Sequence, residues 1–287
     1  MRWEKGRRSS NIEDRRGGVP KGKLALGLGG TVILVVVGLL LGADPEQILN
    51  VAVENQKRAG SAANGGAVVE RPEAENRAAD FVSVVLADTE DVWTELFAKE
   101  GKTYKEPKLV LFTDRVDSAC GRTSASVGPF YCPPDQKVYI DLGFFDDLAS
   151  KHGAAGDFAQ AYVVGHEIGH HIQTLRGTSS KVHRARSGIS KEEGNQLSVL
   201  LELQADCYSG VWAHHADKAR NVLEKGDVDE ALRAAAAIGD DRLQKKARGY
   251  VTPESFTHGT SAQRAKWFRV GLEHGSIQKC DTFDGRM

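Results

Sequence analysis

Residues 163–171, VVGHEIGHH, contain the pattern H-E-x-x-H, which decides both the local fold and the chemistry that this chain can support. Residues four apart on an α-helix lie about 40° apart on one face. His166 and His170 can therefore each direct an imidazole nitrogen to the same divalent ion. Glu167 lies beside them and can reach a water at that ion as a general base. The pattern predicts a helix over residues 158–175 that carries a zinc site.

A zinc site of this kind needs a third protein ligand, which a second predicted helix can provide. Glu202 and Asp206 are four residues apart on that helix, so both point to one side. Glu202 can ligate the metal while Asp206 accepts a hydrogen bond from a ligand histidine. The alternative is a solvated helix face, but the pair is set among apolar residues, which disfavours unpaired carboxylates. These neighbours are Leu200, Leu201, Leu203, Ala205 and Trp212.

Other positions near the motif are less suitable as ligands. His171 points about 100° away from His170 on the same helix, so we expect it to face elsewhere. An H-x-x-G-x-x-H continuation would need a histidine at position 176, which is Arg176. The second helix is itself well marked, because Ser190 and Glu193 form a capping-box pattern at its start. Glu202 therefore remains the best candidate for the third ligand.

Residues 256–264, FTHGTSAQR, hold two candidates for stabilising charge that develops during a reaction. Peptide hydrolysis places negative charge on the attacked carbonyl oxygen, and a fixed hydrogen-bond donor lowers that barrier. His258 or Arg264 could supply the donor. The alternative for His258 is an ordinary loop histidine before the helix predicted over residues 261–274.

The fold class predicted for residues 73–287 is α+β: a mostly helical, zincin-like domain with a small sheet. Sequence periodicity predicts helices over residues 73–99, 158–175, 190–215, 261–274 and within 227–248. Strands are predicted at 109–112 and 137–142, and loops at 114–136, 176–190 and 251–259. We interpret residues 137–142, KVYIDL, as an edge strand that pairs with an extended substrate backbone.

The N-terminal part of the chain predicts membrane attachment. Residues 24–43 contain no charged side chain and, at about 1.5 Å per residue, are long enough to cross a bilayer as one helix. Residues 1–23 hold eight basic and three acidic side chains, which favours a cytoplasmic arm. Residues 44–72 then form a flexible linker to a domain outside the bacterial inner membrane. A buried core helix and a cleaved signal peptide are the alternatives for residues 24–43.

Composition limits the other partners. The formal net charge of −1 gives no global field that would attract nucleic acid. Gly38 and Gly42 form a G-x-x-x-G pattern, so pairing of two copies in a membrane stays open.

Four cysteines in an exported domain suggest two disulfides. We favour Cys120–Cys132 and Cys207–Cys280, with free buried thiols as the alternative.

Together these segments resemble the bacterial "putative neutral zinc metallopeptidase" family of the YpfJ type. The likeness covers nearly the whole chain and rests on the following stretches: MRWEKGRRSSNIEDRRG, CGRTSASVGPFYCPPDQKVYIDL, VVGHEIGHHIQ, LELQADCYSGVWA and SFTHGTSAQRAKWF. It implies a membrane-anchored zincin with one Zn²⁺ and a peptide or protein substrate. The site also resembles membrane zinc peptidases with H-E-x-x-H, E-x-x-x-D and H-x-x-x-x-x-R. That second likeness implies a catalytic role for His258 and a supporting one for Arg264, although Gly259 stands where those peptidases have proline.

The sequence therefore predicts a membrane-anchored zinc peptidase in which His166, His170 and Glu202 bind one Zn²⁺ and Glu167 is the general base. Two alternatives stay open. One is a zinc hydrolase that acts on a non-peptide substrate, because the same chemistry attacks other carbonyls. The other is a non-catalytic envelope protein that keeps zinc for stability.

Overall fold

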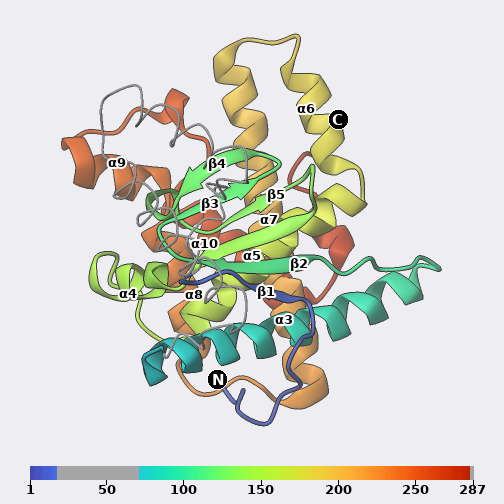
Figure 1. The fold of residues 1–287 in the computed structure, drawn as a ribbon. Coiled ribbons are helices and arrows are strands. Elements are labelled where there is room, and N and C mark those ends of the chain that lie inside the picture. The colour runs from blue at the N-terminus through green and yellow to red at the C-terminus, as the bar shows by residue number, and fades with distance from the viewer. Residues whose placement is uncertain (18–70, 285–287) are drawn as a thin grey trace, which may run out of the picture. The chain divides into compact units, whose positions relative to one another are not determined.

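The computed structural model describes residues 1–17 and 71–284. Within them, a mixed four-stranded sheet lies at the centre of the domain (Figure 1). Its strand order is β1 (Ile12–Asp14), β2 (Lys108–Phe112), β6 (Lys137–Asp141) and β5 (Phe130–Cys132). The first three strands are parallel, and β5 runs antiparallel to β6.

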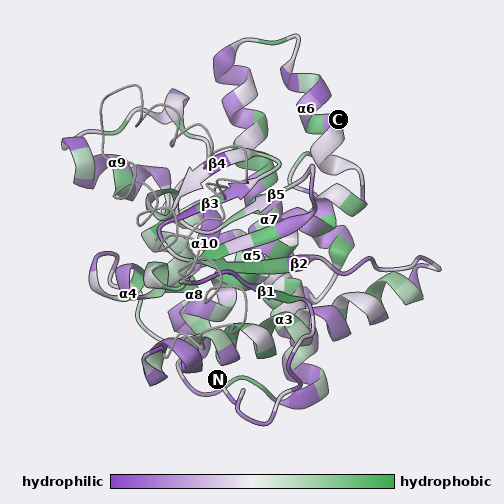
Figure 2. Ribbon diagram, viewed as in Figure 1, coloured by the Kyte–Doolittle hydropathy of each residue, from purple (hydrophilic) through white to green (hydrophobic). Residues whose placement is uncertain are grey.

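The two faces of the sheet bury different clusters. Leu109 and Leu111 of β2 point into the large core that the sheet shares with the helices, whereas Val110 and Phe112 point into a smaller cluster on the opposite face. Val116 of the hairpin formed by β3 (Arg115–Ser118) and β4 (Gly121–Ser124) belongs to the smaller cluster. Figure 2 shows the hydrophobic residues of β2 at the centre of the domain, whereas α9 at its periphery is mainly hydrophilic.

The helices make up most of the described chain. Their bounds are α3 (Glu73–Lys99), α4 (Gly143–Ser150), α5 (Asp157–Leu175), α6 (Thr178–Arg186), α7 (Lys191–Arg220), α8 (Asp227–Ala237), α9 (Asp240–Arg248) and α10 (Ser261–His274). Short 3-10 turns are η1 (Ala125–Val127), η2 (Pro253–Ser255) and η3 (Ile277–Cys280). The predicted capping box at the start of α7 is confirmed, with the Ser190 side chain accepting from Glu193 N. The α+β class with a small sheet is thus confirmed for the domain.

Glycines allow α5 and α10 to pack against α7 almost backbone to backbone. A Cβ added at Gly169 of α5 would lie 2.8 Å from the carbonyl oxygen of Ala205 and 2.9 Å from its Cα. A Cβ added at Gly271 of α10 would lie 2.0 Å from the carbonyl oxygen of Cys207. Real Cβ atoms do not approach backbone so closely, so only glycine fits at these crossings. The approach at Gly169 brings the histidine helix against the turn of α7 that carries Glu202 and Asp206.

The N-terminal segment belongs to the same compact unit as the helical domain. Ile12 pairs with Leu109, and the Met1 ammonium lies 3.0 Å from Asp157 at the start of α5. Basic side chains of the segment pair with acidic side chains of α3, as Arg8 does with Asp80 at 2.6 Å. Residues 1–16 of the predicted basic arm therefore pack as part of the domain, whereas the cytoplasmic location of the arm stays a prediction.

Membrane crossing itself is not supported by the described part of the chain. None of the helices in residues 1–17 and 71–284 combines the length and apolar character needed to cross a bilayer. The predicted span, residues 24–43, and nearly all of the predicted linker, residues 44–72, lie outside the described residues.

Three local predictions were also wrong. Residues 137–142 do not form an edge strand, because β6 lies between β2 and β5. The predicted loop 114–136 contains β3, β4 and β5, whose alternation is masked by Gly, Ser and Pro residues. The predicted loop 176–190 contains α6, a basic helix that buries only Val182 and so lacks an apolar stripe.

Candidate metal centre

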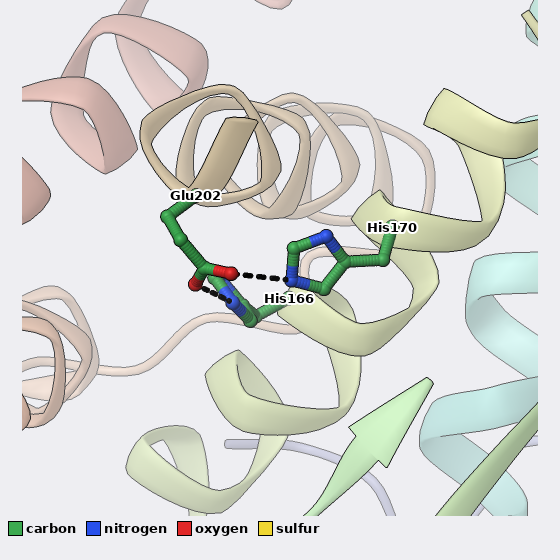
Figure 3. Close-up of side chains that lie close together, drawn as sticks. All are labelled: His166, His170 and Glu202. Atoms are coloured by element: carbon green, nitrogen blue, oxygen red, sulfur yellow. Dashed lines mark hydrogen bonds and ion pairs between the residues drawn. The ribbon is translucent and has the colours of Figure 1, made fainter. Parts of the chain in front are cut away.

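Three side chains from two helices converge at the crossing of α5 and α7 (Figure 3). His166 and His170 lie one helical turn apart on α5, and Glu202 reaches them from α7. The Glu202 carboxylate oxygens lie 3.2 Å from His166 Nε2 and 3.4 Å from His170 Nε2. One potential ligand atom from each residue lies within 4.8 Å of the others. The structure thus brings together the three residues that the sequence predicted as ligands.

The spacing of these atoms fits a zinc ion. Two ligands of a tetrahedral Zn²⁺, each about 2.0–2.2 Å from the metal, are about 3.3 Å apart. The distances from His166 Nε2 to Glu202 Oε2, 3.2 Å, and from His170 Nε2 to Glu202 Oε1, 3.4 Å, are close to that separation, and each involves a different oxygen of the carboxylate. Imidazole nitrogen and carboxylate oxygen are both ordinary zinc donors. Since three protein ligands leave one tetrahedral position open, the set is typical of catalytic sites.

His166 is oriented by a buried, charged network. Its Nδ1 donates to Asp206 Oδ1 at 2.8 Å, so that Nε2 is turned toward Glu202. Asp206 also accepts two hydrogen bonds from Arg264, both at 2.9 Å, and one from Tyr162 Oη at 2.5 Å. Asp206 has no exposed surface and Arg264 is 2% exposed. This network fixes the ring of His166 on the side away from the metal position.

The same network sets the protonation of the metal-free site. Burial acts to lower the pKa of His166, but the carboxylates of Asp206 and Glu202 outweigh it and raise this pKa to about 9. Burial likewise opposes ionisation of Glu202, yet the two histidines hold the pKa of its carboxyl well below the usual range. Burial also disfavours the charged form of Asp206, but Arg264 and His166 keep its pKa low. The two carboxylates are therefore anionic at neutral pH.

His170 has a different partner. Its Nδ1 lies 2.9 Å from Oε1 of Gln173, one turn further along α5. Gln173 has no exposed surface, and its Nε2 donates to the carbonyl oxygen of Leu201 at 2.6 Å. Both histidines thus have an acceptor on Nδ1, which leaves both Nε2 atoms available to a metal. Neither Tyr162 nor Gln173 was predicted from the sequence, although their spacings from the histidines, four and three residues, were available.

Comparison with known proteins agrees with this geometry. The model of one protein family, described as "Putative neutral zinc metallopeptidase", matches residues 1–283. The chain belongs to this family. The Escherichia coli K12 protein YpfJ is 46% identical over 292 residues, which cover 99% of each chain. The Mycobacterium tuberculosis H37Rv protein Rv2575 is 45% identical over 190 residues, or 63% of each chain. Both relatives are uncharacterized proteins, and no solved structure matches the chain.

The resemblance seen in the sequence is thereby confirmed for this zinc metallopeptidase family, and the cavity around the site is consistent with it. His166, Glu167, His170 and Glu202 all line a cavity of about 730 Å³. Glu167 is 7% exposed, and burial raises the pKa of its carboxyl above the usual value. A buried carboxyl with a raised pKa beside a metal site is suited to accept and return a proton.

The walls of the cavity come from segments far apart in the sequence. Phe130 and Tyr131 of the edge strand β5 form part of one wall, and α6 contributes His183 and Arg186. His152, after α4, also lines the cavity. His152 and His183 were predicted to be surface residues rather than site residues, because neither has a motif partner.

His258 lies at the edge of the cavity rather than among the ligands. Asp240 Oδ2 accepts the backbone N–H groups of Thr257, His258 and Gly259, and its Oδ1 lies 3.3 Å from His258 Nδ1. The hydrogen bond to Asp240 raises the pKa of His258 above its usual value. The His258 side chain is 50% exposed. Arg264, by contrast, is wholly engaged inside the domain and supports His166 through Asp206.

His171 faces away from the metal position, as expected. Tyr131 Oη lies 3.0 Å from its Nδ1, and its Nε2 donates to the carbonyl oxygen of Lys105 at 2.6 Å. Burial lowers the pKa of His171 to about 4, so the ring is neutral. His171 therefore ties α5 to the sheet and to the segment before β2.

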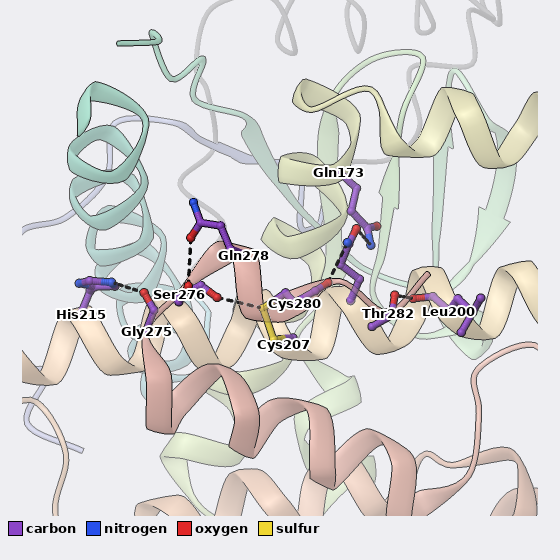
Figure 4. Close-up of a disulfide and its surroundings, with 10 residues drawn as sticks. Gln173, Leu200, Cys207, His215, Gly275, Ser276, Gln278, Cys280 and Thr282 are labelled. Carbon is purple, nitrogen blue, oxygen red and sulfur yellow. Dashed lines mark hydrogen bonds between the residues drawn. A yellow bond between two sulfur atoms is a disulfide. The ribbon is translucent and has the colours of Figure 1, made fainter. Parts of the chain in front are cut away.

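The two predicted disulfides are confirmed, and one of them supports the metal centre. Cys120 pairs with Cys132, which joins the β3–β4 hairpin to β5. Cys207 pairs with Cys280, which holds η3 against α7 (Figure 4). Thr282, just after η3, donates to the carbonyl oxygen of Leu200 at 2.6 Å. The C-terminal segment is thus fixed along the turn of α7 that carries Glu202.

Proposed function

We propose that this protein is a zinc-dependent peptidase whose metal is held by His166, His170 and Glu202. The observation that carries the proposal is the convergence of these three side chains, with one potential ligand atom of each within 4.8 Å of the others, on the wall of a cavity. When bound there, zinc would lower the pKa of a water and polarise a substrate carbonyl. Membership of the zinc metallopeptidase family supports a peptide or protein as the substrate.

Glu167 is the general base in this proposal. It follows His166 directly on α5 and faces the same cavity. Its carboxylate takes a proton from the attacking water and later delivers it to the leaving amine. The raised pKa that burial gives this carboxyl favours the second step, because the carboxyl then holds a proton to higher pH than an ordinary glutamic acid does.

His258 is the proposed donor to the developing oxyanion. Asp240 holds both its backbone and its ring nitrogen, and the raised pKa keeps the ring protonated over a wider pH range. A protonated imidazole at the cavity edge can donate to a carbonyl oxygen as negative charge grows. Arg264 and Asp206 act on His166 instead of on the substrate.

The edge strand β5 is the proposed partner for an extended peptide. Among residues 1–17 and 71–284 it pairs with β6 on one side only, and Phe130 and Tyr131 line the cavity. Backbone pairing at such an edge is a common mode of peptide recognition. Peptides N-methylated at successive backbone nitrogens test this, since methylation at a pairing position should raise KM. Unchanged KM at every position would exclude pairing with β5.

Metal content and turnover together test the proposed function. We expect the purified wild-type protein to bind one zinc, His166→Ala to lose it, and Glu167→Gln to keep zinc but lose turnover by roughly 10²–10⁴-fold. A quenched-fluorescence peptide library is the substrate probe, with p-nitrophenyl esters in parallel. Glu192→Gln, the same change at an exposed position of α7, is the control and should behave as wild type.

The other outcomes would contradict the proposal in distinct ways. Hydrolysis of esters but of no peptide in the library would indicate a non-peptide hydrolase. Zinc binding without Glu167-dependent turnover on either probe would indicate a structural metal. Absence of zinc from the wild-type protein would overturn the metal site itself.

A further inference from the structure

The acceptor on His170 is an amide, and an amide can face a histidine in two ways. If Gln173 presents Oε1, His170 carries its proton on Nδ1 and its Nε2 is free to bind a metal. If the amide is turned by 180°, its NH₂ group donates to Nδ1, and the proton of the neutral ring then sits on Nε2, which cannot ligate. The orientation of this one side chain therefore decides whether His170 is competent as a ligand.

Two groups on α7 set the orientation of Gln173. The carbonyl oxygen of Leu201, which can only accept, lies 2.6 Å from Gln173 Nε2. Gln204 Oε1 lies 3.3 Å from the same nitrogen. A turned amide would place Gln173 Oε1 against these two acceptors, so only the orientation that presents Oε1 to His170 is satisfied.

The orientation of Gln204 is fixed in turn by the C-terminal segment. Gln204 Nε2 donates to the carbonyl oxygen of Cys280 at 2.9 Å, which leaves its Oε1 for Gln173. Cys280 is tied to α7 by its disulfide with Cys207 (Figure 4). Gln173 and Gln204 are 0% and 6% exposed, so water does not replace these contacts freely. We call Gln173 and Gln204 the amide relay.

We propose that Gln173 is a positioning residue that holds His170 in the metal-binding tautomer, and that Leu201 and the relay partner Gln204 fix its amide. The inference rests on the proposed metal site and deepens it. It differs from a packing role, because it ascribes the effect to hydrogen-bond polarity at one ring nitrogen. It also ranks the two amides: the Leu201 carbonyl holds Gln173 independently of Gln204, so Gln173 matters more.

Zinc affinity of the full-length protein, measured by competition with a chromophoric chelator, tests the ranking. Gln173→Met keeps the side-chain volume but removes the acceptor, and we expect zinc affinity to fall about 10–100-fold. Gln204→Met is the matched control: a buried amide on the facing helix, changed in the same way. It should give a clearly smaller loss. Should Gln173→Met fail to fold, Gln173→Asn, which stays polar but is one methylene shorter, should also weaken zinc binding.

A spectroscopic readout separates positioning from general stability. In ¹⁵N-histidine spectra of the zinc-loaded protein, the Nδ1 protons of His166 and His170 should both exchange slowly. In Gln173→Met the His170 signal should exchange fast while the His166 signal, held by Asp206, persists. Zinc affinity equal to wild type in the folded Gln173 variants, or loss of both signals together, would overturn the proposal. If the wild-type protein binds no zinc, the proposed function fails first.

Discussion

His166 and His170, the two histidines proposed as ligands, differ in what holds them, although they lie on one helix and face one carboxylate. His166 is held by an ionised network in which Asp206 and Arg264 are both almost fully buried. His170 is held by a neutral amide, Gln173, which hydrogen-bonds to a backbone carbonyl. Removing one partner of a buried ion pair exposes the other charge to an apolar interior, whereas losing a neutral hydrogen bond costs far less. The His166 side should therefore dominate stability.

The two sides also contribute differently to the site: one joins the helices of the domain, and the other orients one histidine. The charged side joins α5, α7 and α10, because Tyr162, Asp206 and Arg264 come from these three helices in turn. The neutral side joins α5 to the C-terminal segment through Gln204 and Cys280. One side thus links the main packing helices of the domain, and the other adjusts a single ligand.

Asp206→Ala should give the largest effect that follows from this comparison. Arg264 would keep its buried position but lose both hydrogen bonds to a carboxylate. We expect the free energy of unfolding of the zinc-free protein to fall by about 3–5 kcal/mol, the usual result of leaving a buried charge unpaired. Urea unfolding in the presence of a chelator measures it.

Gln173→Met, on the neutral side, provides the comparison for that value. It should reduce the same free energy by about 1–3 kcal/mol, because a buried acceptor loses its donor without leaving a charge behind. The interpretation of the two sides as unequal would be wrong if both variants lost the same free energy of unfolding.

The pH dependence of the charged side is also defined. The pKa of Asp206 is lowered, so its stabilisation is present above its unfolded pKa and is lost as pH falls through the lowered value.

Gly169→Ala should have the next largest effect, because it acts on the crossing that both sides share. The added Cβ would meet the backbone of Ala205, which cannot move aside as a flexible side chain could. We expect a net loss of about 1–3 kcal/mol from overpacking, despite the better helix propensity of alanine. Thermal unfolding and zinc competition should both report it, since Glu202 would shift away from the histidines.

Gly188→Ala is the matched control for that change. A Cβ at Gly188, between α6 and α7, would meet nothing within 4 Å. Its stability and zinc affinity should equal those of wild type. An equally stable Gly169→Ala protein with normal zinc affinity would show that the helix approach does not position the ligands.

The parts of this molecule that were predicted from sequence are those whose signal is local. H-E-x-x-H and the Glu202–Asp206 pair are helical spacings, so their geometry follows from one turn of helix. The distance between the two helices depends on residues far apart in the sequence, yet the glycines at the crossing indicate that this distance is short. Gln173 could also have been predicted as a partner of His170, because it lies three residues later on the same helix. A glutamine by itself, however, does not indicate a metal site.

The parts that were missed depend on distant partners. β1 is three residues long and pairs with β2, which lies more than ninety residues later in the chain. Nothing in Ile12–Asp14 alternates for long enough to mark a strand. The basic side chains of the same segment were interpreted as a membrane signal, whereas they pair with acidic side chains such as Asp80 and Glu90 of α3. The positive charge of a segment alone does not show whether it faces a membrane or pairs with acidic side chains of the same protein.

Asp240→Asn should give the smallest effect at neutral pH and compares the cavity edge with the buried ligands. Asp240 raises the pKa of His258, so His258 keeps its proton to higher pH in the folded protein. The contribution of protonated His258 to kcat/KM is therefore present below the unfolded pKa of the ring, about 6.5. It is lost as pH rises through the raised pKa of His258 in the folded protein. Removing the carboxylate charge lowers that pKa, so the alkaline fall of kcat/KM should move to lower pH while zinc content stays unchanged.

His258→Gln provides the control for that profile. It removes the titrating group, so kcat/KM should be reduced and this alkaline fall should disappear, with the dependence on Glu167 retained. An Asp240→Asn profile that coincides with wild type would mean that His258 does not act in its protonated form. A shift accompanied by loss of zinc would instead place the effect on the ligands, although Asp240 contacts the 257–259 backbone and His258 and none of the three ligands. The pH profile and the zinc content therefore have to be measured on the same preparation.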